Sequence, residues 1–273
     1  MKLLTTNTKL EKIPGVEQKY LVRGMSLAPA HASGHNVCAW AGACVAACVL
    51  WFAGRTVMKN VRAAMIARTR LFFDDRVAFI AKLRRELTAL LAAADRAGAV
   101  AVVRLNTASD IVWERVAPEV FAEFPRITFY DYTKAPAKRR ATLPANYHLS
   151  HSIHEGTTFA EVCDAFNAGR NVVAVFDSLY RPQQGKFGAL PARVIFRGPA
   201  GETLDVETVN GDVQDVRIPE LDGRRRCVVL AGKGGAVRVA EARAAGFVRQ
   251  SPVVGIVAGD ASRLDGVAVV TLL

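Results

Sequence analysis

Three of the five cysteines lie within eleven consecutive residues, at Cys38, Cys44 and Cys48. Their spacing is Cys-x5-Cys-x3-Cys, whereas the familiar spacing of radical enzymes is Cys-x3-Cys-x2-Cys. Three clustered thiolates can hold an iron–sulfur cluster that leaves one iron open, or a zinc ion that takes a fourth ligand from elsewhere. The trio therefore predicts a metal centre, with a [4Fe–4S] cluster as the first candidate and zinc as the alternative.

The stretch around these cysteines has two other interpretations. The segment from Val37 to Gly54 is apolar and nearly uncharged, as a membrane span would be. It is shorter than the roughly 20 apolar residues that a spanning helix needs, and it lacks the basic lead-in and cleavage site of a signal peptide. Buried cysteines can also act as small hydrophobic residues, but this accounts for one or two of them better than for three. We therefore expect a metal at the trio and no membrane contact.

Composition and charge narrow the class of protein. At 273 residues the chain can bury a full hydrophobic core, as one domain of barrel size or as two domains. Its content of 51% hydrophobic and 22% charged residues is typical of a globular protein. The net charge of +11 indicates an anionic partner, with nucleic acid ahead of a membrane surface; general solubility is the alternative explanation. The odd number of unevenly placed cysteines does not fit a secreted disulfide framework, so we expect a cytoplasmic protein.

The apolar pattern predicts the helices and strands that would position these groups. Two long helices are expected between residues 56 and 98, and the second begins at Asp74-Asp75 and ends at Gly98. After Gly98, strands alternate with helices, which predicts an α/β fold with a parallel sheet, open or closed into a complete or partial (β/α) barrel. The expected strands are 99–105, 127–132, 146–150, 171–176, 206–212 and 227–231, with helices at 115–124 and 158–169. We expect three parts, which are an N-terminal cysteine-cluster segment (1–55), an α/β domain (56–240) and a C-terminal tail (241–273).

Polar side chains follow several of these strands at their carboxyl ends. In parallel α/β folds ligands bind at this edge of the sheet, so side chains from different strands are expected to share one mouth. Carboxylates, lysine and histidine move protons when their pKa values are tuned. The candidate catalytic residues are Asp110, Asp131, Lys134, His148 and Asp212. The candidate cofactor-binding residues are Asn106, Ser109 and Lys233, of which the last lies in a glycine-rich turn suited to cradle a phosphate.

Several stretches over residues 5–240 resemble, in order and spacing, the phage and plasmid proteins of the gene product 88 family. They include Ser26-Leu27-Ala28-Pro29-Ala30, Asn36-Val37-Cys38, Gly42-Ala43-Cys44-x3-Cys48, Arg104-Leu105-Asn106, Ser109-Asp110-Ile111-x-Trp113-Glu114, Phe129-Tyr130-Asp131-Tyr132-Thr133-Lys134, Asn146-Tyr147-His148-Leu149 and Asn210-Gly211-Asp212-x2-Asp215-x-Arg217. The resemblance implies a cysteine-cluster protein of a mobile element, similar in outline to radical-type iron–sulfur barrels. It implies no specific reaction.

The leading functional hypothesis is an iron–sulfur enzyme, radical-SAM-like, that acts on a nucleic acid or nucleotide. The three cysteines would hold the cluster at the mouth of the barrel, and the open iron would bind a small molecule, with S-adenosylmethionine as the first candidate. One alternative is a nucleic-acid-binding protein whose structural zinc is held by the cysteines and by His31 or His35. A second alternative is a magnesium-dependent nuclease or hydrolase built on Asp110, Asp131 and Asp212. If Asp110 and Asp212 only cap turns, they have no part in chemistry.

Overall fold

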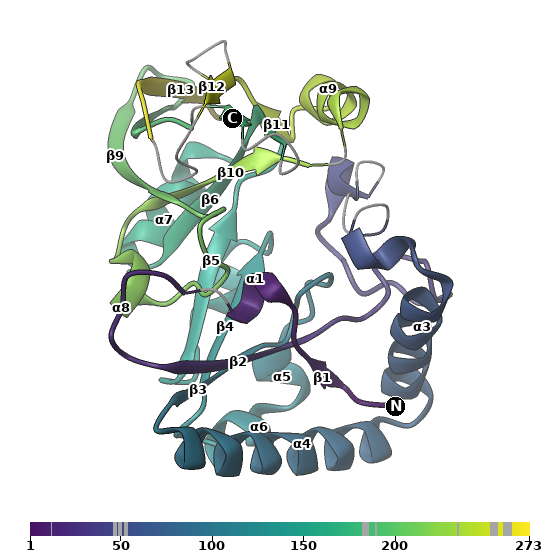
Figure 1. Cartoon of the computed structure of the whole chain (residues 1–273). Helices are drawn as coiled ribbons and strands as arrows, with labels where there is room; N and C mark the ends of the chain where they lie inside the picture. Colours follow the sequence, from purple (N-terminus) through teal and green to yellow (C-terminus); the bar gives the residue numbers. More distant parts are fainter. Residues whose placement is uncertain are drawn as a thin grey trace.

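The computed structural model places the chain in an α/β fold built on one large, mostly parallel sheet (Figure 1). It describes residues 1–11, 13–45, 48, 51, 54–181, 186–188, 190–233, 235–251, 256–258 and 264–273. The centre of the sheet contains, in chain order, β2 (Tyr20–Met25), β3 (Val100–Arg104), β4 (Thr128–Thr133), β5 (Tyr147–Ser152) and β6 (Asn171–Arg181). Each of these strands is parallel to the one before and paired with it. The predicted α/β class and parallel sheet are confirmed.

Beyond β6 the order of strands in the sheet departs from their order in the chain. β10 (Cys227–Gly232) pairs with β6, and β9 (Thr203–Asn210) pairs with β10, both in parallel. β8 (Arg193–Arg197) is antiparallel to β9, β13 (Val267–Thr271) is parallel to β8, and β1 (Leu4–Thr5) is antiparallel to β2. The short strands β7 (Lys186–Gly188), β11 (Val248–Arg249) and β12 (Ile256–Ala258) lie off this path. In the described part of the chain the path ends at β1 and β13, so the sheet is open and the predicted complete barrel is not formed.

α-Helices join most of the consecutive parallel strands, and local capping explains the ends of the longest one. Between β2 and β3 lie α3 (Lys59–Asp74) and α4 (Arg76–Ala97). Asp75 caps α4, because its Oδ1 accepts a hydrogen bond from the Ala78 N–H at 2.9 Å, and Gly98 ends the helix in the left-handed conformation at φ +58°. α5 (Trp113–Val116) and α6 (Pro118–Glu123) join β3 to β4, and α7 (Phe159–Asn167) joins β5 to β6. These helices lie where the apolar pattern predicts them.

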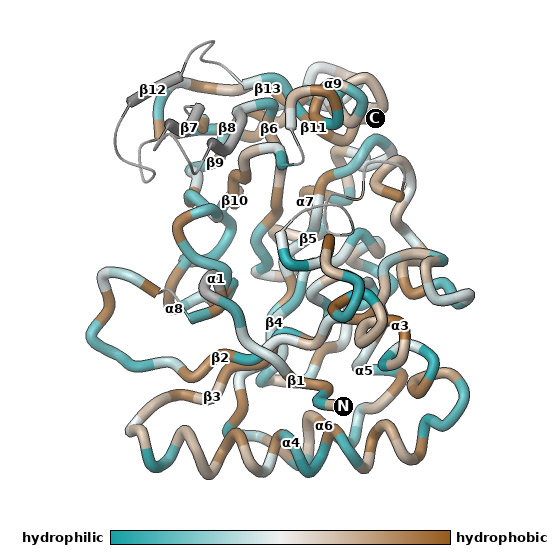
Figure 2. The backbone as a smooth tube through the Cα atoms, turned by 45° about the vertical axis from the view of Figure 1, so that its right-hand side comes forward, coloured by the Kyte–Doolittle hydropathy of each residue, from teal (hydrophilic) through white to brown (hydrophobic). Residues whose placement is uncertain are grey.

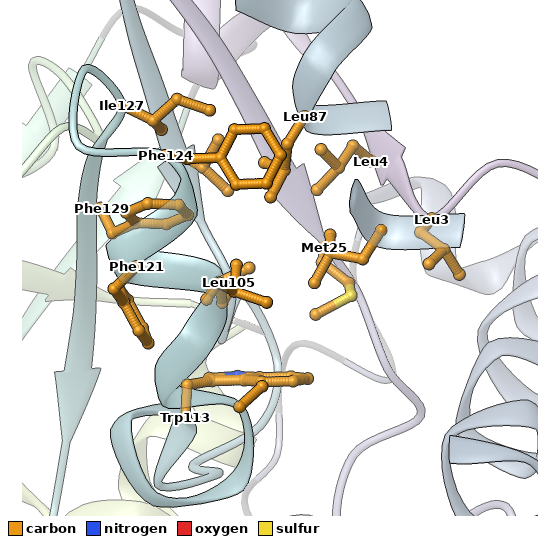
Figure 3. Close-up of a cluster of buried hydrophobic side chains, with 14 of the residues drawn as sticks. Leu3, Leu4, Met25, Leu87, Leu105, Trp113, Phe121, Phe124, Ile127 and Phe129 are labelled. Carbon is orange, nitrogen blue, oxygen red and sulfur yellow. The ribbon is translucent and has the colours of Figure 1, made fainter. Parts of the chain in front are cut away.

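One face of the sheet carries these helices and most of the hydrophobic core. Figure 3 shows side chains of Met25, Leu105 and Phe129, from the region of three neighbouring strands, in one cluster with Leu87 of α4 and Trp113 of α5. The core continues along β5 and β6, where it packs against α7. Crossovers between neighbouring parallel strands are right-handed, and they therefore fall on the same face. Sequential parallel strands with helices on one face are the arrangement of a partial (β/α) barrel.

The opposite face is covered by α1 (Thr8–Glu11) and by the chain between β9 and α8 (Pro219–Asp222). Val216 and Ile218 from this segment pack against Tyr130 of β4. Arg104 Nη1 lies 2.9 Å from the carboxylate of Asp215, and the Tyr130 hydroxyl donates a hydrogen bond to that carboxylate at 3.0 Å. Side chains therefore fill this face of the sheet next to β3 and β4.

Hydropathy along the backbone agrees with this layering. Figure 2 shows hydrophobic and hydrophilic residues alternating along α4, as expected for a helix with one buried side. Among the helices that the structure describes, none has both the length and the apolar composition needed to cross a bilayer. β2 and β13 come from the predicted N-terminal segment and the predicted tail, and both belong to the central sheet. The division at residues 55 and 240 stays a prediction.

Candidate functional site

Cys38 lies at the carboxyl edge of the sheet, against the loop that follows β3. Its Sγ accepts a hydrogen bond from the Ala30 N–H at 3.4 Å, and its thiol donates to the Ala108 carbonyl at 3.6 Å. The Asp110 N–H donates to the Val37 carbonyl at 2.8 Å, which joins the two loops beside the thiol. The chain that leaves β2 therefore brings the first cysteine next to Asp110, as the sequence predicts.

Cys44 and Cys48 lie near enough to Cys38 to act on its thiol. Burial raises the pKa of the Cys38 thiol to about 11; the Ala30 N–H opposes this shift, and Cys48, Asp110 and Cys44 add to it. All three cysteines are half-buried, and none of them is in a disulfide. Within the described residues, no three side chains of His, Cys, Asp or Glu are grouped closely enough to hold a metal ion. The trio is therefore gathered in one place, but its sulfur atoms are not arranged as a finished metal site.

Glu155, which follows β5, holds the short 3-10 helix Gly42–Cys44 in place. Its Oε1 accepts a hydrogen bond from the Ala43 N–H at 2.6 Å. Gly42 has a φ of +51°, and a Cβ atom on it would overlap this carboxylate oxygen. Sequence reasoning missed Glu155, although it belongs to the polar run after a strand that the carboxyl-edge rule singles out.

Asp131 is fully buried beneath the loop after β3 and is surrounded by hydrogen-bond donors. Its Oδ1 accepts from the Asn106 N–H at 2.6 Å, and its Oδ2 accepts from the Tyr147 hydroxyl at 2.8 Å. The Asn106 amide group adds a third, longer bond at 3.3 Å. Burial raises the pKa of Asp131 to about 7, and these donors act in the opposite direction.

The side-chain carbonyl of Asn106 organises the rest of that loop. Its Oδ1 accepts hydrogen bonds from the Ser109 hydroxyl at 2.8 Å, the Ile111 N–H at 3.0 Å and the Trp113 Nε1–H at 3.1 Å. We call Asn106, Ser109, Trp113, Asp131 and Tyr147 the Asp131 network. The predicted cofactor-binding residues Asn106 and Ser109 are thus engaged with one another, and a role in binding a ligand stays a prediction.

Asp110 is joined to β4 and to a buried ion pair. Its Oδ2 accepts a hydrogen bond from the Lys134 N–H at 2.8 Å, and Arg140 Nη1 lies 3.6 Å from its Oδ1. Arg140 is itself fully buried, with two hydrogen bonds to the Glu114 carboxylate at 2.7 and 2.6 Å. Burial raises the pKa of Asp110, while the Lys134 N–H and the positive charge of Arg140 oppose that shift. The ammonium group of Lys134 lies 5.2 Å from the centre of the Phe247 ring.

The structure places Asp212 and Lys233, two other predicted site residues, away from Asp110 and Asp131. Asp212 follows β9, where its carboxylate lies 3.0 Å from Lys233 Nζ and accepts a hydrogen bond from the Ala231 N–H at 2.7 Å. In the sheet, β5, β6 and β10 lie between β9 and β4. Asp212 therefore lies apart from Asp110 and Asp131, the other two aspartates of the magnesium hypothesis. The predicted site residues do not all share one pocket.

His148 is at the opposite edge of the sheet. The strand that contains it begins at Tyr147, so His148 is near the amino end of β5 and not at the carboxyl end that we expected. There it lines a cavity of about 350 Å³, and burial lowers its pKa. Of the two candidate zinc ligands, His35 stacks on Phe73 with ring centres 4.3 Å apart and His31 is exposed, and a role for either in binding zinc stays a prediction.

Comparison with known proteins identifies the family of this chain. The family model described as Gene product 88 matches residues 1–251. No curated protein and no solved structure matches the chain. The matched range contains the three cysteines, the Asp131 network and the strands from β1 to β11, so the predicted resemblance is confirmed over the whole candidate site. The chain belongs to the Gene product 88 family.

Proposed function

We propose that this protein is an iron–sulfur enzyme of a mobile element, with a [4Fe–4S] cluster held by Cys38, Cys44 and Cys48. The observation that carries the proposal is the position of Cys38 beside Asp110, with Cys44 and Cys48 near enough to act on its thiol, on the loop that leaves the first parallel strand. The carboxyl edge of a parallel sheet is where ligands bind in such folds, because the loops there converge from several strands.

The donor chemistry of the trio supports a thiolate-ligated cluster. Three cysteine thiolates are the ligands that a cluster with one open iron requires, and N–H groups directed at sulfur tune such clusters. Cys38 already accepts a hydrogen bond from the Ala30 N–H. Because its thiol pKa is about 11, cluster binding would release a proton from it. Cys44 and Cys48 would have to move towards Cys38, since the sulfur atoms are not grouped at ligand distances in the described residues.

The neighbouring side chains suggest how the chain would serve such a cluster. When bound, a cluster with an open iron supplies one-electron chemistry to a small molecule such as S-adenosylmethionine. Glu155 would hold the cysteine-bearing loop through the Ala43 N–H, and Asp110 and Lys134 would orient polar groups of a substrate at the same edge. Asp131, with its raised pKa, would hold or release a proton beneath them.

The test is the metal content of the full-length protein purified without oxygen. We expect a brown protein with broad absorbance near about 400 nm and with iron and acid-labile sulfide in equal amounts. Replacing Cys38, Cys44 and Cys48 together by Ala should remove the colour. Cys163→Ala is the matched control, because Cys163 is also a half-buried thiol but lies on α7. If the purified protein is colourless and contains stoichiometric zinc, the iron–sulfur proposal is wrong and the protein has a structural zinc site.

We further propose a nucleic acid or nucleotide as the substrate class, on the strength of the net charge of +11. Some basic residues that cluster in the sequence are used inside the protein, since Arg62 and Arg68 donate to backbone carbonyls and Arg140 to Glu114. Exposed members of the same clusters are Arg70, Lys138, Arg139, Arg224 and Arg225.

Binding to single-stranded DNA and RNA should weaken with salt, with a log–log slope of about 0.7 for each phosphate neutralised. Replacing Lys138 and Arg139 together by Gln should reduce that slope. Arg84→Gln, which removes an exposed arginine paired with Glu123, is the control and should leave it unchanged. Affinity independent of salt would remove nucleic acid as the substrate class.

A further inference from the structure

The cavity beside His148 has features of a second binding site. Its volume is about 350 Å³, which is within the range of sites for small molecules. It lies at the amino ends of β5 and β6, whereas the cysteines are at the carboxyl edge. From the charges and the shape of its lining we infer that this cavity binds a small organic phosphate.

The lining carries positive charge and no carboxylate. Arg170, Arg217 and Arg224 contribute guanidinium groups, and of these Arg217 is neutralised by Asp222, whose carboxylate lies 3.2 Å from it. Arg170 is 7% exposed, and in the described part of the chain no carboxylate forms an ion pair with it. A buried charge without a counter-charge is costly unless a ligand supplies one.

Arg170 is held in place by the protein yet keeps part of its donor capacity. One of its Nη2 hydrogens is donated to the backbone carbonyl of Arg140, which anchors the end of the side chain. Its Nη1 has no hydrogen-bond partner among the described residues. Burial lowers the pKa of Arg170 and the charge of Arg140 lowers it further, while Glu114, which is hydrogen-bonded to Arg140, opposes the shift; an anion at the cavity would favour the charged guanidinium. A phosphate oxygen is a suitable acceptor, because guanidinium and phosphate match in geometry.

Arg224, from the segment between α8 and β10, supplies the second guanidinium. It is exposed, and its Nη1 lies 3.4 Å from the position that a Cβ atom on Gly169 would take. Asn171 fixes the segment that carries Arg224, because its Nδ2 donates to the Gly223 carbonyl at 3.0 Å and its Oδ1 accepts from the Arg226 N–H at 2.9 Å. Two guanidinium groups thus border one cavity from separate, anchored segments.

The remaining lining indicates that the ligand has an organic part. Leu143 and Ile218 give the cavity apolar walls, and His148 lies beside them as a half-buried, weakly basic ring. The groups that act on His148 are Glu220, which favours its charged form, and Arg224, which disfavours it. An inorganic phosphate would leave these walls uncovered, whereas a phosphorylated ring or chain would cover them.

The experiment compares adenosine 5′-monophosphate, adenosine and inorganic phosphate as probes of the full-length protein, by isothermal titration calorimetry. We expect the monophosphate to bind, inorganic phosphate to bind more weakly, and adenosine not to bind. Arg224→Gln should weaken the monophosphate roughly tenfold or more, because one charge-assisted contact is lost. The control Arg197→Gln removes an exposed arginine of β8 that does not line the cavity, and it should change nothing.

Three results would overturn the inference. The first is equal binding of adenosine and its monophosphate, and the second is equal affinity of the wild type and Arg224→Gln. The third is displacement of the monophosphate by an oligonucleotide without terminal phosphates, which would assign the site to a nucleic-acid backbone. Arg170→Lys provides a second variant that retains the charge but loses the planar donors, and it should also weaken binding. The triple cysteine variant should bind the monophosphate normally, so this inference can fail or succeed independently of the iron–sulfur proposal.

Discussion

The surroundings of Arg140 and of Arg170, two buried arginines in direct contact, compensate charge in different ways. Arg140 is fully buried and is paired with the Glu114 carboxylate through two hydrogen bonds. Arg170, just before β6, is 7% exposed, and its acceptor among the described residues is the backbone carbonyl of Arg140. A buried charge that is paired with a carboxylate stabilises the structure, whereas one without a hydrogen-bonded carboxylate is available to a ligand. The comparison predicts opposite roles for arginines of similar burial.

Removing Arg140 should have the largest effect. Arg140→Met leaves the Glu114 carboxylate buried without its cation, and the loss of one partner of a buried pair costs about 3–5 kcal/mol. Urea unfolding of the two proteins, followed by circular dichroism, measures the difference in free energy of unfolding. Arg139→Met is the matched control, because this neighbouring arginine is exposed, and it should change the stability little. Equal effects of the two substitutions would mean that the Arg140–Glu114 pair does not stabilise the fold.

The Asp131 network should give the stability a distinct dependence on pH. Burial raises the pKa of Asp131 to about 7, whereas an aspartate in an unfolded chain titrates near pH 3.9. Between these values the folded protein binds a proton that the unfolded chain has lost. The free energy of unfolding should therefore fall as the pH rises through this window, by up to about 1.4 kcal/mol per pH unit, and the contribution is fully present only below the unfolded pKa.

Urea unfolding at several pH values between about 4 and 8 tests this dependence. Asp131→Asn cannot titrate, so its stability should vary less with pH than that of the wild type, whatever the absolute cost of the substitution. Asp95→Asn, which alters an exposed carboxylate paired with Arg126, should retain the wild-type slope. If the wild type and Asp131→Asn have parallel curves, Asp131 titrates normally in the folded protein.

Removing Arg170 should have the smallest effect of the three. Arg170→Met loses the hydrogen bond to the Arg140 carbonyl, which is worth about 1 kcal/mol, but it also removes a buried charge that has no carboxylate partner in the described residues. The two contributions oppose one another, so the net change in the free energy of unfolding should be below about 1 kcal/mol. The same urea experiment, run beside Arg140→Met, makes the comparison direct. A loss as large as that of Arg140→Met would contradict the distinction between the two arginines.

The elements that sequence reasoning predicted well are those with a strong local pattern. The helix from Arg76 to Ala97 begins after Asp75 and ends before Gly98, where capping residues mark both ends. The strands from Val100 onward follow the alternation of apolar runs and polar turns, and they form the parallel sheet. The carboxyl-edge rule also placed Asp110 beside Cys38, because parallel strands all end on one side.

The features that were missed depend on contacts between distant parts of the chain. The separation of Asp212 from Asp131 follows from the insertion of β10 between β6 and β9, which no local pattern encodes. His148 was assigned to the wrong edge, because an apolar run shows that a strand exists more clearly than it shows where the strand begins. The burial of Arg140 depends on Glu114, which is 26 residues away, and a basic stretch in the sequence does not reveal such a partner.

The order of strands in the sheet has a consequence for synthesis on the ribosome. Each strand from β3 to β6 pairs with the strand made just before it, so this half of the sheet can assemble as the chain emerges. The cysteines and the Asp131 network lie within it and need no later strand. β10 pairs with β6, although β7, β8 and β9 come between the two in the chain, so this pairing forms late in synthesis. Arg224 is made only shortly before β10. The carboxyl edge can therefore acquire its shape while the nascent chain still lacks the guanidinium group that Arg224 adds to the cavity lining.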